Sequence, residues 1–581
     1  MANTLTGAEA GTVPAKPKRG WFDFGHIRGD IYGGVTAGIV ALPLALAFGE
    51  ASGAGPVAGL WGAIITGFFA ALFGGTQTQI TGPTGPMVVV FAGLAAGVQE
   101  EVGALAFGEV AGIVFAAVVL AGVFQILMGV FKLGNTIRLV PYPVISGFMS
   151  GIGVIIILLQ FSRLFGSAPE GGSTIAALRA IPGAVASPDL AALMIGVLTL
   201  AIVFFWPPKI GRYLPGALAA LIVGTVIGLF LDVPKLAESL PEGFGGGLAA
   251  LPSFVLPDIG LLSGGALFLV IEAAIILAAL GAIDSLLTSL VADNATRTRH
   301  DSDQELIGQG IGNGIAGLFG AIPGAGATMR TMVNIKTGGM TRLSGMVAGL
   351  LLLSIVLVFS GLAAQIPYAV LAGILVKVGW DIIDVGYITR AHKGPRWDLV
   401  LMAVVLLLTV FWNLIYAVLL GVFLGALGYV KNIADQQLAT FGSVVTPLGT
   451  EEERILKDAK GRIQLFEFDG PLSFGAAADL SHQVRDKVRD TEAIVLDFSR
   501  KPRVDVSAAR AVESIIDDAK DARKAVFVCG VNEKIAGQLK GLGADKGLQP
   551  GWETRSRLDA LRLAEQAVRE DGAAPTGALP A

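Results

Sequence analysis

The stretch Thr76-Gln-Thr-Gln-Ile-Thr-Gly-Pro-Thr-Gly-Pro-Met-Val-Val-Val90 separates two strongly apolar segments of the chain. Because proline lacks a backbone donor and glycine weakens helices, its composition predicts extended backbone from Thr76 to Pro83. A helix can then begin near Thr84, which suits an N-cap, and continue to Ala96. The free N–H groups of a half-helix that starts inside a bilayer carry partial positive charge, so the stretch predicts an anion site. The alternative interpretation is a proline kink in an ordinary spanning helix.

The composition is that of an α-helical polytopic membrane protein with closely packed helices. Of the 581 residues, 53% are hydrophobic, 15% are charged and 79 are glycine. The single cysteine, Cys529, excludes an internal disulfide. No phosphate loop, nucleophile elbow or zinc-protease motif is present, so we expect neither an enzyme nor an ATP-driven pump, and no cofactor. Nucleic-acid binding has no support in the distribution of charge.

The apolar runs predict fourteen membrane spans. This number counts the broken segment 76–96 as one span and divides Leu306–Asn334 into two. The first twenty residues lack the apolar core of a signal peptide, and an even number of spans places both termini in the cytoplasm. Basic residues such as Lys132, Arg297 and Lys393 fall in turns that this topology places inside. We therefore expect a multi-pass protein of the plasma membrane, which is the inner membrane in a bacterium.

The two halves of the span region echo each other. Gly67–Gly74 leads into the first break, and the similar Gly314–Gly320 leads into a second break at Pro323–Thr331. Spans one to seven start inside and spans eight to fourteen start outside, which predicts an inverted repeat of seven plus seven spans. The two half-helices then begin near the midplane of the membrane and face each other.

After Lys431 the sequence becomes charged and alternating, which predicts a small soluble α/β domain. We expect strands at 462–468, 493–498 and 525–529, and helices at 475–489, 508–522 and 532–542. The chain then divides into five parts: a cytoplasmic segment (1–28), a transmembrane domain (29–433), a linker (434–460), the α/β domain (461–570) and a disordered tail (571–581).

Asp284 lies deep in the eighth span, where a carboxylate requires a partner or a function. Thr288 lies four residues later on the same helix face. With oxygens from the two breaks, these side chains form an oxygen-only set suited to a small hard cation, and sodium is the natural candidate; the further members are Thr84, Thr328 and the carbonyls at Gly326 and Ala327. Two alternatives are that Asp284 carries a proton or that it caps the opposing half-helix.

Two further residues concern the anion. Arg330, in the first turns of the second half-helix, either adds positive charge to the anion site or extends to the cytoplasmic side. Phe48, at the end of the first span, is a candidate wall of the cavity.

Several stretches resemble the SulP anion transporters, the sulfate-permease family: Gly29–Gly49, Pro141–Gly153 and Asn294–His300. Others are most similar to the sodium-dependent bicarbonate transporters of that family: Ala41–Ile64, Asp284–Thr288 and Gly324–Met329. The resemblance implies a transporter of seven plus seven spans with core and gate domains that moves like an elevator. It also implies that the α/β domain is a STAS domain that supports homodimerisation.

The resemblance also implies the site. Sodium is expected at Thr84, Asp284, Thr288, Gly326 and Thr328. Bicarbonate is expected between the two half-helices, and the candidate substrate residues are Phe48, Thr84, Gly85, Ala327, Thr328, Met329 and Arg330.

One departure concerns Arg330, which resembles sulfate- and chloride-transporting relatives, whereas the bicarbonate branch can have glycine there. Sulfate, another inorganic anion or a dicarboxylate, coupled to protons or exchanged, therefore remains an alternative substrate, and an anion channel or a membrane sensor are alternative classes. Two half-helix N-termini together supply about one positive charge, which balances one monovalent anion. We therefore expect bicarbonate, with Arg330 pointing outward.

The segment Val504–Ala509 resembles the loop that is phosphorylated in anti-sigma-factor antagonists. Ser507 is accordingly a candidate phosphorylation site, and a helix N-cap is the alternative.

Overall fold

The computed structural model describes residues 24–571 except for 104, 135–140, 168–173, 212–213, 237–251, 256–262, 413, 441–446, 469–490, 501–505, 544, 546–547 and 549–550. The expected helix at 475–489, most of the N-terminal segment and nearly all of the C-terminal tail lie outside the described residues. The chain forms two compact units, Met1–Val422 and Phe423–Ala581. The division into five parts stays a prediction.

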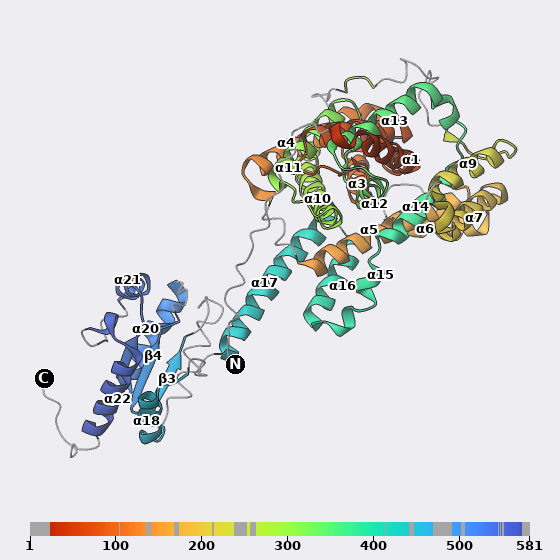
Figure 1. Ribbon diagram of the computed structural model, residues 1–581. Coiled ribbons are helices and arrows are strands. Elements are labelled where there is room, and N and C mark those ends of the chain that lie inside the picture. The colour runs from red at the N-terminus through yellow and green to blue at the C-terminus, as the bar shows by residue number, and fades with distance from the viewer. Residues whose placement is uncertain are drawn as a thin grey trace. The chain divides into compact units, whose positions relative to one another are not determined.

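The first unit is helical, and a helix corresponds to each of the fourteen expected spans, the last of which continues past Val422 into the second unit (Figure 1). These helices are α1 (Ile27–Ala51), α2 (Pro56–Phe73), α3 (Gly85–Glu101), α4 (Phe107–Val130), α5 (Tyr142–Leu164), α7 (Leu190–Phe205), α9 (Gly216–Gly228), α10 (Gly264–Thr296), α11 (Ser302–Leu318), α12 (Thr328–Lys336), α13 (Arg342–Ala363), α14 (Tyr368–Ile382), α16 (Arg396–Phe411) and α17 (Leu414–Thr440). The sequence did not indicate the remaining helices, α6 (Thr174–Ala186) and the short α8 (Pro208–Gly211) and α15 (Val385–Ile388).

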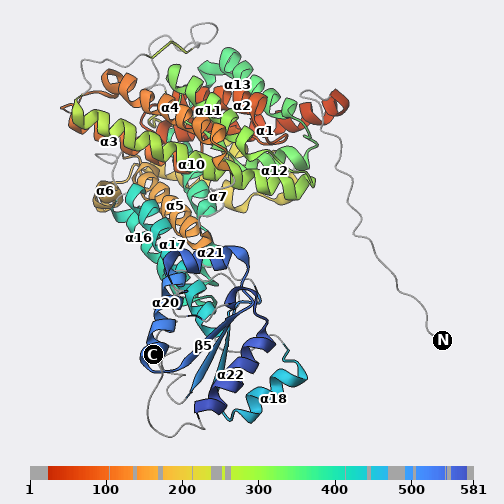
Figure 2. The same ribbon diagram turned by 90° about the vertical axis from the view of Figure 1, so that its left-hand side faces the viewer.

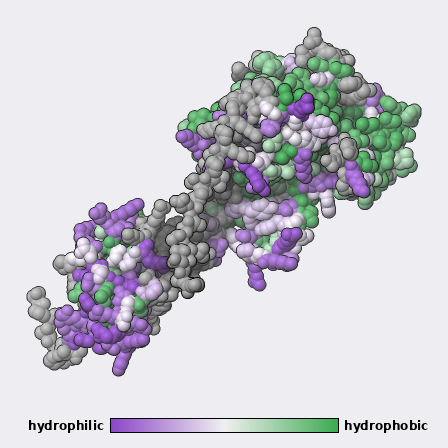
Figure 3. Space-filling view, in the orientation of Figure 1, coloured by the Kyte–Doolittle hydropathy of each residue, from purple (hydrophilic) through white to green (hydrophobic). Residues whose placement is uncertain are grey.

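The apolar helices make this a multi-pass membrane protein. Among the described residues, five helices are long and apolar enough to cross a membrane, or six if the bent pair of α6 and α7 counts as one span. Large apolar side chains such as Leu190, Phe205 and Phe230 are 71%, 84% and 84% exposed, as expected of a surface that faces lipid. Figure 3 shows this apolar surface in green over the first unit and a hydrophilic surface over the second. That the chain crosses the membrane fourteen times stays a prediction.

The helices of the first unit pack in two groups. In the first group, α11 contacts α4 and α2, α13 contacts α1 and α2, and α10 contacts α3, α4 and α12. In the second, α5 contacts α14 and α16, and α7 contacts α9 and α14. Figures 1 and 2 show the two groups side by side. We call the first group the core and the second the gate. Each group takes helices from both halves of the chain, as an inverted repeat requires.

The two broken segments meet in a short antiparallel pairing. Strand β1 (Thr81–Gly82) pairs with β2 (Ala325–Gly326), and Thr81 lies opposite Gly326. β1 leads into α3 through Thr84, which has extended backbone at the N-cap position, and β2 leads into α12 through Ala327. The prediction of two half-helices that begin face to face inside the unit is therefore confirmed, and a simple proline kink is excluded.

The second unit contains a parallel sheet in the order β3 (Ile463–Glu467), β4 (Ala493–Asp497) and β5 (Ala525–Cys529), at the three positions expected. Helices α20 (Val506–Asp521) and α21 (Glu533–Leu542) cover one face, and the unexpected helices α18 (Thr450–Asp458) and α22 (Arg557–Asp571) cover the other. Side chains alternate between the two faces: Ile494 and Leu496 pack with α20, whereas Val495 packs with α22.

Candidate functional site

Thr288 of α10 joins two of the expected sodium ligands directly. Its hydroxyl, which is fully buried, donates to the Gly326 carbonyl at 2.9 Å and lies 2.8 Å from the Thr328 hydroxyl. One turn earlier on α10, Ser285 accepts the Gly326 N–H at 3.0 Å. These bonds fix the second break, at β2 and the start of α12, against α10.

Asp284 precedes Thr288 by one helical turn on α10. Its carboxylate lies near the Thr84 hydroxyl of the first break and near the Arg330 guanidinium. The Thr84 hydroxyl is buried, and apart from the neighbouring Asp284 carboxylate it has no hydrogen-bond partner among the described residues. Thr84 thus occupies the N-cap position of α3 without capping the helix through its side chain. A buried, unpartnered oxygen beside a carboxylate is a geometry that a small cation can complete.

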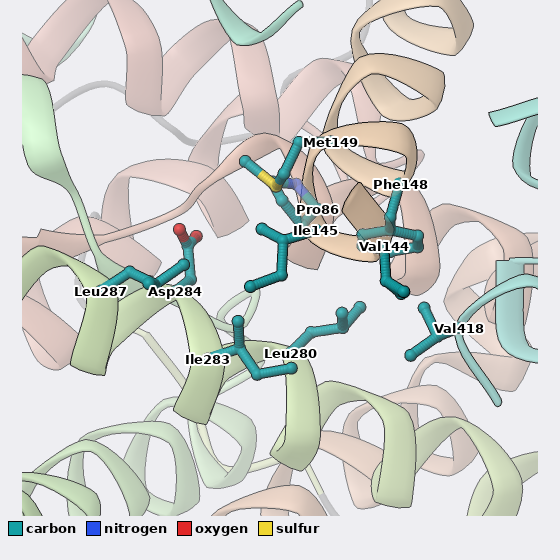
Figure 4. Close-up of a pocket in the computed structure, with 10 residues that line it drawn as sticks. All are labelled: Pro86, Val144, Ile145, Phe148, Met149, Leu280, Ile283, Asp284, Leu287 and Val418. Carbon is teal, nitrogen blue, oxygen red and sulfur yellow. The ribbon is translucent and has the colours of Figure 1, made fainter. Parts of the chain in front are cut away.

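A narrow hollow reaches Asp284 between the core and the gate. Asp284 is the only charged residue among its ten lining residues, which are Pro86, Val144, Ile145, Phe148, Met149, Leu280, Ile283, Asp284, Leu287 and Val418. Figure 4 shows Asp284 at the rim, with the carboxylate turned away from Leu280 and Ile283. The hollow is otherwise apolar, so a charged cargo that enters it finds its polar partners at Asp284 and the broken segments.

Arg330 does not point outward, and that expectation is wrong. The side chain is 2% exposed, and its Nη2 donates to the Pro83 carbonyl at 2.6 Å. Its Nη1 is buried without a hydrogen-bond partner among the described residues, and it lies against Gly82, where a Cβ would approach it to 2.5 Å. The short break before α3 attracts the guanidinium, because the Pro83 carbonyl has no helical partner there. Arg330 therefore places a full positive charge beside the first half-helix.

The other expected substrate residues lie around the same point. Gly85 is the first residue of α3, and a Cβ there would lie 2.7 Å from the side-chain end of Ile382 of α14 and 3.0 Å from that of Ile156 of α5, so α3 lies close to the gate at this point. Ala327 is the N-cap of α12, and Met329 on its first turn is 68% exposed. Phe48 is buried on α1, a helix that contacts α3 and α12.

The sequence reasoning missed a polar face of α11 that holds both breaks in place. Glu305, which is 1% exposed, accepts the backbone N–H groups of Gly75 and Thr76 at 2.9 and 2.8 Å. Gln309 donates to Glu305 and to the Thr81 hydroxyl. Asn313 donates to the carbonyl of Gly324 and accepts its N–H, at 3.0 and 2.8 Å. The spacing of four among these polar residues, which places them on one face of the helix, was the signal that could have found them.

Gln79 connects this polar face to α10. It donates to Glu305 at 2.8 Å and accepts the hydroxyl of Ser289 at 2.9 Å. A Cβ at Gly326 would collide with the Gln79 amide, so glycine at this position lets the two breaks come together. The first break, the second break and α10 are therefore one connected polar network, and α11 supports it from behind.

The oxygen ligands and the fixed charges define the chemistry of the site. The described residues contain no group of three or more His, Cys, Asp or Glu side chains that could hold a metal ion. Hydroxyls, one carboxylate and a backbone carbonyl suit a hard monovalent cation better than a transition metal. The N-termini of α3 and α12 and the side chain of Arg330 supply positive charge that could bind an anion beside the cation ligands. No nucleophile with a neighbouring base is present in this set.

Ser507, the candidate phosphorylation site, lies in the first turn of α20. Its side chain lies outside the described residues.

Two broken helices that meet beside a buried carboxylate in a helical membrane protein are typical of secondary transporters. The family comparison agrees with this class. Residues 27–405 match the sulfate permease family and residues 454–559 match the STAS domain. The chain belongs to the sulfate permease family. It is an anion transporter and not an enzyme.

Individual relatives agree with the family. The chain is 43% identical over 549 residues to the bicarbonate transporter BicA of Picosynechococcus sp., covering 93% of this chain and 95% of the relative. It is 30% identical to a putative sulfate transporter of Bacillus subtilis, covering 87% and 92%. Among solved structures, the transmembrane domain of a cyanobacterial BicA matches with 44% identity and a TM-score of 0.62, covering 68% of this chain and 98% of that one. SLC26A9 has the same fold, with a TM-score of 0.75 at 17% identity, covering 95% and 92%.

Proposed function

We propose that this protein is a sodium-coupled bicarbonate transporter that works by elevator-type alternating access. The observation that carries the proposal is the buried link from Thr288 to the Gly326 carbonyl and the Thr328 hydroxyl, one helical turn from Asp284. Together with the Thr84 hydroxyl, these groups form an oxygen set for sodium. The bicarbonate transporters that share 43% and 42% identity with the chain support the choice of anion.

The binding of both ions at one place would couple their movement. Sodium at Asp284 would neutralise the carboxylate, and bicarbonate would lie between the N-termini of α3 and α12, beside Arg330. Since each ion reduces the electrostatic cost of the other, the loaded site is favoured over the singly occupied one. Such a site moves as a unit with the core, because the polar face of α11 and Gln79 hold all of its elements together.

The proposal extends to the surroundings of the site. Both termini face the cytoplasm of a cell whose plasma membrane, or bacterial inner membrane, holds the protein. The STAS domain supports a homodimer, and Ser507 is a phosphorylation site that regulates the STAS domain. None of the proposed ion ligands lies in that domain.

The experiment is the replacement Asp284→Asn, with Glu272→Gln as the matched control that neutralises another acid of α10. The amide keeps the shape of the side chain and loses the charge, so sodium-stimulated bicarbonate uptake into proteoliposomes should disappear for Asp284→Asn and persist for Glu272→Gln. Uptake by Asp284→Asn that still rises with sodium would remove Asp284 from the cation site. Wild-type uptake that follows the pH gradient and ignores sodium would make Asp284 a proton carrier.

The position of Arg330 favours a second candidate function, sulfate transport. Counting charges, the two helix N-termini supply about one positive charge. Arg330 adds one positive charge and Asp284 adds one negative charge, so the net charge without sodium is about one positive charge, which a monovalent anion balances. A bound sodium ion raises the net charge to about two, which a divalent anion balances. A relative 30% identical to the chain is described as a putative sulfate transporter. Sulfate uptake by the wild type that is lost in Arg330→Gly would support this function instead.

A further inference from the structure

An ion pair joins the core to the gate at one end of the transmembrane unit. Arg163, at the end of α5, lies with its Nη1 3.0 Å from Oε1 of Glu50, at the end of α1. The two side chains are only 24% and 14% exposed. Since α1 packs in the core and α5 packs in the gate, this contact ties the two groups together.

This end is the outer one in the topology expected from the basic residues. The first and fifth spans both run outward, so Glu50 and Arg163 lie near the outer surface. A hollow beside the pair is lined by residues that the same topology places outside, among them Val233, Pro234 and the start of α14 at Tyr368. The ion pair therefore connects core and gate at the edge of this hollow.

The opposite end is open. A second hollow lies between Leu287 of α10, in the core, and the gate residues Tyr142, Trp380 and Asp384, which the expected topology places on the cytoplasmic side. The hydrogen bonds of Tyr142 and Ser146 to Asp384, at 2.7 and 2.8 Å, lie within the gate and do not cross to the core. Leu287 also lines the hollow that reaches Asp284, so the cytoplasmic opening leads toward the candidate site.

We propose that Glu50 and Arg163 form the outer gate of the transport pathway and stabilise the conformation that opens to the cytoplasm. The proposal rests on alternating access, as the proposed function does, but it is independent of which anion and which coupling ion are carried. When the core moves past the gate to open the outer side, the carboxylate and the guanidinium must separate and regain water. The pair therefore sets the balance between the two conformations.

The physical consequence is a population shift when either charge is removed. A partly buried pair loses its attraction, and the remaining charge is better hydrated in the open conformation, so the outward-open state gains population. Coupling energies between sites typically correspond to changes of about 5-fold to about 150-fold in an equilibrium constant. Exchanging the two charges restores the attraction with the opposite polarity and should restore the wild-type ratio of the two conformations.

The test measures access from the cytoplasmic side without substrate. Leu287→Cys serves as the reporter, because Leu287 is 38% exposed and lines the cytoplasmic hollow, in a Cys529→Ala background that removes the only native thiol. The rate of labelling by a membrane-impermeant maleimide in inside-out vesicles reports the inward-open population. Glu50→Gln and Arg163→Gln should each slow labelling, at most by the factor in which the equilibrium constant changes, and the exchange Glu50→Arg with Arg163→Glu should restore the rate.

Lys377→Gln is the matched control, since Lys377 forms its ion pair with Asp381 inside the gate helix α14. It should leave the labelling rate unchanged. Unchanged rates in both single variants, or single-variant defects that the charge exchange does not repair, would overturn the proposed gate. A protein whose labelling responds as expected but that takes up no bicarbonate would instead overturn the proposed function and leave the gate standing.

A second experiment covers variants that fail to insert. In a Glu50→Cys and Arg163→Cys protein, a short cleavable cross-linker should stop anion uptake, and cleavage of the linker should restore it. Uptake that continues at the wild-type rate in fully cross-linked protein would show that these ends do not separate during transport.

Discussion

Thr288→Val tests how the second break is held at the candidate sodium site. Valine has almost the same shape as threonine and replaces the hydroxyl with a methyl group. The lost hydroxyl donates to the Gly326 carbonyl at 2.9 Å and bonds the Thr328 hydroxyl at 2.8 Å, in a place that solvent does not reach. The variant therefore removes one proposed sodium ligand and releases two others.

The magnitude follows from these two bonds. A hydrogen bond between neutral groups contributes about 1 kcal/mol, and a buried acceptor left unpartnered costs about 1–3 kcal/mol. A loss of about 1–3 kcal/mol in sodium binding corresponds to an increase of about 5-fold to about 150-fold in the sodium concentration for half-maximal uptake. The maximal rate at saturating sodium should change much less, because the anion site keeps its helix N-termini and Arg330.

The assay is labelled bicarbonate uptake into proteoliposomes across a series of sodium concentrations. The matched control is Thr296→Val, since Thr296 lies on the same helix and its hydroxyl bonds the Ala292 carbonyl and Thr298 away from the site. An unchanged sodium requirement in Thr288→Val, or an equal increase in Thr296→Val, would refute the role assigned to Thr288.

Three further predictions concern single features of the protein. Arg330→Gly should lower the sodium concentration for half-maximal binding, because it removes a positive charge near Asp284. The same change should weaken anion binding. Scintillation proximity titrations with each labelled ion measure the two affinities. Deletion of Glu451–Ala581 should leave sodium and anion binding intact in correctly inserted protein while weakening dimerisation, and complete loss of binding would mean that the site is elsewhere. Cys529 should resist maleimide at neutral pH until the STAS domain unfolds, because burial and the neighbouring Asp497 raise the pKa of its thiol, and rapid labelling of folded protein by mass spectrometry would contradict this.

The sequence was sufficient to predict the two breaks because proline and glycine act locally. Pro83 cannot continue a helix and Pro86 is tolerated only in a first turn, and the extended backbone and the start of α3 at Gly85 follow from this. The echo between the two halves then located the second break. The strands of the STAS domain were predictable for the same local reason, since each is a short run rich in apolar and β-branched residues within a charged sequence.

The sequence was insufficient where the structure depends on distant partners. The direction of Arg330 is decided by the Pro83 carbonyl, 247 residues earlier in the chain. The same holds for Glu305, whose carboxylate satisfies the N–H groups of Gly75 and Thr76 at the first break. Helix α6 was also not predictable from the sequence. It is short, and Pro182 interrupts its apolar run.

The most direct test of the central claim is a side-by-side measurement of labelled bicarbonate and labelled sulfate uptake by the wild-type protein. Proteoliposomes would be given an inward sodium gradient, no sodium gradient or an inward proton gradient, at a pH where bicarbonate predominates. The account predicts bicarbonate uptake that requires the sodium gradient and little sulfate uptake under any condition. Sulfate uptake that exceeds bicarbonate uptake, or bicarbonate uptake that is equal with and without sodium, would contradict it.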